Sequence, residues 1–188
     1  MKKIIQFLIL IVIVNTVSGC KKDEDPVTIP PVPTNETEIM TTFKLIFTDS
    51  AGFAPTVTAE YRDPDGDGGN PAVQFDTIKL LANKTYFANA FILDETKNPV
   101  DTISNEVMEE ANDHLFFYTT SGFSATVAIV DFDTHNPPLP VGLQTKWKTM
   151  GIGNGTVQVV LRHQPNIKDG MFAPGETDID LVFSYLVQ

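Results

Sequence analysis

The stretch TVQVVLRHQ, residues 156–164, alternates apolar and polar side chains with a period of two. Val157, Val159 and Leu161 fall on one face of an extended chain, and Arg162 falls on the other. This period is that of a β-strand with one face against a core. The stretch therefore predicts a half-buried strand, with His163 on the core-facing side or at its rim.

Comparable segments follow one another through the chain, separated by turns rich in Gly, Pro, Asn and Asp. One other segment, Ser104–Asn112, contains helix formers and predicts a short helix that is capped by Ser104 and crosses between sheets. The sequence thus predicts an all-β fold, a single β-sandwich that is immunoglobulin-like or related, with about nine strands. The expected strands are Ile39–Thr48, Thr56–Tyr61, Phe75–Leu81, Thr85–Leu93, His114–Thr119, Ala125–Phe132, Gly142–Met150, Gly155–Gln164 and Asp178–Val187.

The segment LLANKTY, Leu80–Tyr86, places a tyrosine six residues after a leucine at the start of a strand. This spacing resembles the tyrosine corner of immunoglobulin-like sandwiches, in which the hydroxyl group binds backbone a few residues upstream. The alternative is an ordinary hairpin with a buried tyrosine.

The first residues are typical of a secretory signal, because a basic start is followed by an apolar run, Ile4–Val14, and small residues. The run is shorter than the roughly 20 residues that span a bilayer. Val17–Cys20, VSGC, resembles the lipobox of bacterial lipoproteins, which implies cleavage before Cys20 and lipidation of its thiol. The predicted organisation is a signal peptide at 1–19, a lipidated tether at 20–38 and one domain at 39–188.

The tether begins with a charged cluster, Lys21–Asp25, and continues as a proline-rich spacer. An acidic cluster after the lipidated cysteine resembles the surface-export signal of Bacteroidetes lipoproteins; the alternative is a solvated charged tether. The expected location is the outer membrane, lipid-anchored and exposed at the cell surface.

The whole chain has a formal net charge of -11 and a single cysteine. An acidic surface disfavours nucleic acid, which requires basic patches, and suits cationic ligands or partners. One cysteine cannot form an internal disulfide.

The run DPDGDG, residues 63–68, matches the first half of an EF-hand-type calcium loop. Asp63, Asp65 and Asp67 would supply the oxygen ligands, and glycines permit the tight bend. Gln74 stands where the loop would need its closing glutamate, so Asp76 or Glu60 would have to replace it. The two interpretations are a Ca²⁺ site and a plain acidic turn.

Three histidines are candidate ligands for zinc, copper or haem iron. His114 shares strand parity with Phe116 and Tyr118, so His114 and His163 meet if their strands are neighbours. His135 belongs to a second polar cluster with Asp131 and Asp133, which is either a metal site or a strand-ending turn. The simpler interpretation of His114 and His163 is two satisfied side chains at sheet ends.

No catalytic motif is present: the sequence has neither a Gly-x-Ser-x-Gly elbow nor His-Glu-x-x-His, and lipidation would consume its thiol. We therefore expect no enzyme; a glycan hydrolase remains the enzymatic alternative, since it needs only two placed carboxylates. The aromatic residues are expected in the core more than in a ligand pocket, namely Phe116, Phe117, Tyr118, Phe123 and Trp147.

Five short stretches, YRDPDGDGGNP, LANKTY, DHLFFY, LRHQP and GETDI, are similar to a group of small Bacteroidetes surface lipoproteins. That group often carries the label "type 1 periplasmic binding fold superfamily protein". The label is a name here and not a fold, because such proteins have two α/β lobes and this chain is strand-rich.

The expected function is a non-enzymatic surface binding module. It would capture a metal ion, a metal chelate or another nutrient for an outer-membrane transporter. The alternative is a structural or adhesive accessory lipoprotein that docks to a membrane partner through an apolar patch or a sheet edge.

Overall fold

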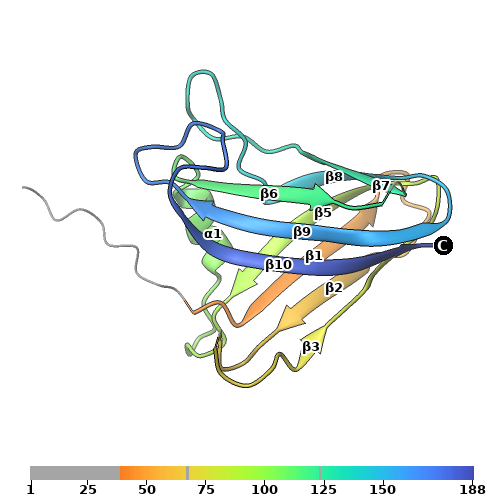
Figure 1. Cartoon of the computed structure of the whole chain (residues 1–188), viewed down its shortest axis with the longest axis horizontal. Helices are drawn as coiled ribbons and strands as arrows, with labels where there is room; N and C mark the ends of the chain where they lie inside the picture. The colour runs from red at the N-terminus through yellow and green to blue at the C-terminus, as the bar shows by residue number, and fades with distance from the viewer. Residues whose placement is uncertain (1–38, 67, 123) are drawn as a thin grey trace, which may run out of the picture. The chain divides into compact units, whose positions relative to one another are not determined.

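The computed structural model describes residues 39–66, 68–122 and 124–188, which form two β-sheets packed face to face (Figure 1). The first sheet has six strands in the order β3-β2-β1-β5-β8-β7, and the second has four in the order β4-β10-β9-β6. The predicted all-β sandwich with one short helix is confirmed. The elements are β1 Thr42–Asp49, β2 Val57–Arg62, β3 Gln74–Phe75, β4 Ile78–Leu80, β5 Thr85–Leu93, α1 Ile103–Glu109, β6 His114–Thr120, β7 Ala125–Ile129, β8 Gln144–Thr149, β9 Gly153–His163 and β10 Glu176–Val187.

The core lies between the sheets and follows from the alternation in each strand. In β1, Phe43, Leu45 and Phe47 are all buried, whereas Lys44 between them points away from the core. The ring of Phe43 lies 6.0 Å from that of Phe183 in the other sheet. Such burial of large apolar side chains is the dominant stabilising term for a domain of this size.

The strand β9, which contains residues 156–163 of the stretch TVQVVLRHQ, lies between two other strands of its sheet. It pairs antiparallel with both β10 and β6. Val157, Val159 and Leu161 are buried, as the period predicts. Val160, on the opposite face, is also buried, and the loop after β9 lies near this face, since Phe172 packs edge-on against Phe117 of β6 at 5.1 Å.

The expected strand Phe75–Leu81 is divided between the two sheets. β3 pairs antiparallel with β2 in the first sheet, whereas β4 pairs parallel with β10 in the second. The Asp76 carboxylate accepts a hydrogen bond from the Glu60 N–H at 3.1 Å and closes the β2–β3 pairing. Ile78 and Leu80 then enter the core from the second sheet. This division raises the number of described strands from the expected nine to ten.

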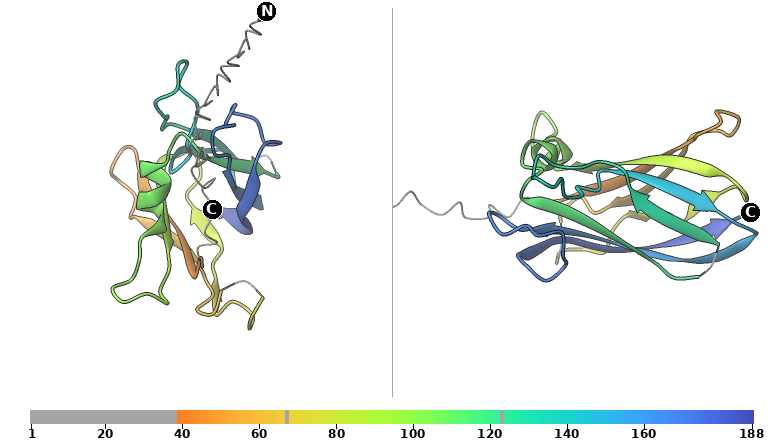
Figure 2. Two further views of the ribbon diagram at one scale, coloured as in Figure 1. Left: turned by 90° about the vertical axis from the view of Figure 1, so that its left-hand side faces the viewer. Right: turned by 90° about the horizontal axis from the view of Figure 1, so that it is seen from above.

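The helix α1 connects β5 of the first sheet to β6 of the second, as expected, and lies at one end of the domain (Figure 2). The expected cap at Ser104 is wrong: the helix begins after Thr102, and no side chain caps it. Ser104 is instead buried in the first turn. The start is set by Ile103 and Val107, which lie one turn apart and both pack into the core.

The tyrosine corner is present. Tyr86 is fully buried, and its hydroxyl oxygen accepts a hydrogen bond from the Leu81 N–H at 3.1 Å. This contact fixes the chain where it leaves β4 and enters β5. Within the described part of the chain, no helix is long and apolar enough to cross a membrane.

Candidate metal centre

Two histidines meet at the end of the sandwich that carries α1. His114, the first residue of β6, is the register partner of His163, the last residue of β9. Their rings are stacked, with centroids 4.6 Å apart and planes 8° from parallel. The condition that the sequence left open, that these two strands are neighbours, is therefore met.

A carboxylate completes the cluster. Glu110 follows α1 directly and stands four residues before His114. One potential ligand atom from each of Glu110, His114 and His163 lies within 4.8 Å of the other two. Glu110 is exposed, His163 is half-buried and His114 is only 7% exposed, so the cluster has one solvent-facing side and one buried side.

The hydrogen bonding of His114 indicates which of its nitrogens is available to a metal. Its Nδ1 lies 3.1 Å from the main-chain oxygen of Glu110. A carbonyl oxygen only accepts, so this contact assigns a proton to Nδ1 and leaves the lone pair on Nε2. A ligating histidine is commonly oriented in this way, through its second ring nitrogen and a backbone carbonyl.

The surroundings of His114 favour its neutral form. Burial lowers its pKa from the ordinary value of 6.5, and the neighbouring His163 lowers it further. The Glu110 carbonyl and the charges of Asp178 and Glu110 act in the opposite direction but do not prevail. A neutral imidazole is the form that binds metal ions.

The loop after β9 is held close to His163. Arg162, on the other face of the strand, donates a hydrogen bond to the main-chain oxygen of Pro174 at 3.0 Å. Gly175 has a φ of +77°, and a side chain at this position would collide with the main-chain oxygen of His163. This close approach requires glycine and keeps the loop against the end of β9.

The third candidate histidine, His135, belongs to a separate and internally satisfied cluster. Its Nδ1 lies 2.8 Å from Oδ2 of Asp133, which also forms an ion pair of 2.8 Å with Nζ of Lys168. Asp131 accepts hydrogen bonds from the main-chain N–H groups of Gly142 and Leu143 at 3.0 and 2.9 Å. These contacts favour the turn interpretation of this cluster over the metal-site interpretation.

The Asp133 carboxyl is strongly acidic. Burial acts to raise its pKa, but hydrogen bonds from Lys168, from the main-chain N–H of Leu139 and from His135 outweigh this effect and bring the pKa to about 2. The group is therefore an anion that its protein neighbours neutralise.

The residues of the acidic loop are only partly placed, because Asp67 lies outside the described residues, as Cys20 does. Asp63 is buried directly after β2, and Asp65 is exposed in the turn. Both residues that were expected to close a calcium site are engaged elsewhere. Asp76 accepts hydrogen bonds from Glu60 N–H and Gln74, and Glu60 pairs with Lys44 at 3.2 Å.

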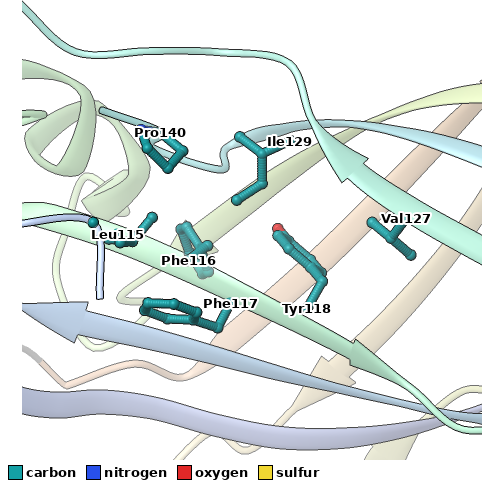
Figure 3. A pocket seen from close by; sticks show the side chains of 8 residues that line it. Leu115, Phe116, Phe117, Tyr118, Val127, Ile129 and Pro140 are labelled. Carbon is teal, nitrogen blue, oxygen red and sulfur yellow. The ribbon is translucent and has the colours of Figure 1, made fainter. Parts of the chain in front are cut away.

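An apolar groove of about 290 Å³ lies where an edge of each sheet meets the other, between β6 and β7 (Figure 3). Phe117 and Tyr118 line it together with Val127 and Ile129. Phe116 also borders the groove, but it is fully buried in the core, as is Trp147. Phe123 lies outside the described residues.

Comparison of the chain with protein-family models, with curated proteins and with solved structures gives no match. The candidate centre therefore rests on its own chemistry. The one ligand that the sequence argument missed is Glu110. Its signal was the spacing of four residues before His114, but Glu110 fell inside the expected helix Ser104–Asn112 and was given no role there.

Proposed function

We propose that this chain is a lipid-anchored cell-surface module that captures a divalent transition-metal ion at Glu110, His114 and His163. The observation that carries the proposal is the approach of three donor atoms to within 4.8 Å of one another. They come from the end of a helix and from two strands. Two imidazoles and a carboxylate are the donor set that suits zinc and copper ions.

The number of ligands supports reversible capture. Structural zinc sites have four protein ligands, whereas sites with three keep a position open for water or another molecule. Here the open position would be taken by water or by the chelate that delivers the metal. A site with an exposed carboxylate at its entrance, in a chain of charge -11, attracts cations from solution.

The anchor and the recipient complete the proposal. The VSGC lipobox at Cys20 and the acidic cluster after it support a lipid anchor at the cell surface. The resemblance to small Bacteroidetes surface lipoproteins supports the same location. The captured ion would pass to an outer-membrane transporter, the partner that a tethered binding module serves.

Calorimetric titration of the EDTA-stripped full chain with Zn²⁺, and separately with Cu²⁺, tests the proposal. We expect one ion per chain, and a loss of affinity of at least about tenfold in His163→Ala and in Glu110→Gln, because each removes a ligand. His135→Ala and Glu109→Gln are the matched controls and should bind as the wild type does. No binding by the wild type, or equal losses in the controls, contradicts a site at this cluster.

One observation favours the alternative, a module that docks to a membrane partner. Phe132 on one loop and Ile167, Met171 and Phe172 on another are all exposed by half or more. The Lys168–Asp133 ion pair holds these two loops together at the same end of the domain. Two results together would favour docking. The chain would bind no metal, and it would recover a stoichiometric membrane partner that is lost when Phe132 and Phe172 are both replaced by serine.

A further inference from the structure

The turn between β2 and β3 holds a buried carboxylate in a fixed position. Asp63 follows the last residue of β2, and its main-chain N–H donates to the Thr41 carbonyl at 2.7 Å. Its own carbonyl accepts from the N–H of Gly66 at 3.2 Å, and Gly66 has a φ of +75°. The backbone therefore fixes where the Asp63 side chain lies, independently of any ligand.

This side chain is incompletely satisfied. Asp63 is 4% exposed, and its Oδ2 accepts a long hydrogen bond of 3.3 Å from the Tyr61 hydroxyl. Its Oδ1 is shielded from solvent and has no hydrogen-bond partner within the described ranges. A buried carboxylate oxygen without a partner is strongly unfavourable, so such an atom points to something that is bound there.

A second carboxylate approaches the first. Asp65 accepts hydrogen bonds from the main-chain N–H and the side-chain amide of Asn70, at 2.9 and 2.8 Å, both on Oδ2. These bonds, Asn70 N–H first, and a side-chain hydrogen bond with Asp63 hold the pKa of Asp65 below its ordinary value. Two carboxylates in contact repel each other unless a proton or a cation lies between them.

The protein supplies no such cation in the part of the chain that the structure describes. The basic side chain next to the turn, Arg62, is already paired with Glu95 at 2.5 Å, and Lys44 on the neighbouring strand β1 is paired with Glu60. No ion pair of the described residues involves Asp63 or Asp65. The pair is therefore balanced either by a proton that the two carboxyls share or by a bound cation.

We propose that Asp63 and Asp65 bind a hard divalent cation, Ca²⁺, through Oδ1 of Asp63 and the carboxylate of Asp65. Ca²⁺ takes oxygen ligands only and accepts backbone carbonyls and waters in its remaining positions. The site differs in chemistry from the cluster at His114, which offers two nitrogen donors. With two carboxylates identified, the affinity belongs in the weak range of extracellular modules, a Kd of about 10⁻⁴–10⁻³ M.

The test is thermal unfolding and calorimetry of the EDTA-treated full chain in rising CaCl₂. We expect saturable binding in that range and a Tm that rises with calcium. Asp65→Asn should abolish both effects, and because Asp65 is exposed, this variant should still fold. Asp101→Asn, an exposed aspartate that accepts one main-chain hydrogen bond, is the matched control and should keep both effects.

Two further results separate this site from the histidine cluster and from a shared proton. His114→Ala should respond to calcium as the wild type does, and Asp65→Asn should bind zinc as the wild type does. A wild type without calcium binding overturns the proposal. So does a calcium response that survives in Asp65→Asn. A chain that ignores calcium but loses stability as pH rises through the carboxyl range holds a proton between the two aspartates, which also overturns it.

Discussion

At the scale of single residues, His114 is held in place by burial, by stacking and by a hydrogen bond. It is almost fully buried, stacked on His163, and bound through Nδ1 to the Glu110 carbonyl. Two imidazolium ions in such a stack would repel each other strongly. The buried ring is the one whose environment excludes the charge.

This environment predicts a dependence of stability on pH. The pKa of His114 is lower in the folded chain than its ordinary value of 6.5. Below about pH 6.5 the unfolded chain therefore binds more protons at this position than the folded chain does. As the pH decreases from this value, the free energy of unfolding decreases, until the pH passes the folded pKa. Urea unfolding of the metal-free chain between pH 5 and pH 7.5 measures the slope. We expect a smaller slope in His114→Gln than in the wild type; equal slopes in the two chains would contradict the prediction.

The sequence could predict the side of the strand on which each histidine lies, because strand parity is a local property. His114 and His163 were placed correctly on the core side of β6 and β9 in this way. Parity could not identify Glu110, because this residue follows α1 and belongs to no strand. Nor could parity identify the ion pair between Asp133 and Lys168, which are 35 positions apart and meet only through the packing of two loops.

At the scale of elements, the loops at the α1 end act as a connected unit. Lys168 is held in the loop after β9, and its side chain is only 1% exposed. It forms the ion pair with Asp133 in the loop after β7 and donates to the Ala111 carbonyl just after α1, at 2.7 Å. One ammonium group thus joins three segments beside the histidine cluster.

We therefore expect Lys168→Met to be strongly destabilising. The substitution keeps most of the side-chain volume but leaves the buried Asp133 carboxylate without its cation, which costs roughly 3–5 kcal/mol in such pairs. Equilibrium unfolding in urea measures the loss. The double variant Lys168→Met with Asp133→Leu removes both charges and should recover part of it. A loss below about 1 kcal/mol in the single variant would be the value of an exposed pair and would contradict the burial of this one.

The division of the expected strand Phe75–Leu81 shows the limit of periodicity as a guide. The residues do form strands, and Ile78 and Leu80 do face the core, as their alternation indicates. Alternation does not indicate which strand is the pairing partner. The change of sheet between Phe75 and Ile78 therefore became visible only in the pairing of β3 with β2 and of β4 with β10.

At the scale of the whole molecule, both proposed metal sites lie where strands end. His114 and His163 are the terminal residues of β6 and β9, and Asp63 follows β2. The sheets hold the two histidines in rigid positions, and the connecting segments supply the carboxylates, in keeping with the common placement of functional groups on loops of a rigid scaffold. The acidic surface serves both sites by attracting cations.

The anchor makes a prediction for the whole chain. If Cys20 is lipidated, Cys20→Ala should move the protein from the membrane fraction to the soluble fraction, since acyl chains provide the membrane affinity. Fractionation of cells that express each form, with detection by antibody, measures this. Zinc binding by the soluble variant should be unchanged, because the donors belong to the folded domain. Retention of Cys20→Ala in the membrane fraction would show attachment by another route.

The position of β10 inside its sheet also determines which of the two sheets can form first during synthesis. β4 has no neighbour in this sheet other than β10, and the register joins Ile78 to Tyr185, a separation of about 100 residues. On the ribosome, residues 78–80 are therefore made long before their partner exists. The six-stranded sheet has all its strands by residue 149, whereas the four-stranded sheet must wait for residues 176–187. A nascent chain that ends before residue 176 lacks β10, so part of the apolar face of the six-stranded sheet is still uncovered and available to chaperones.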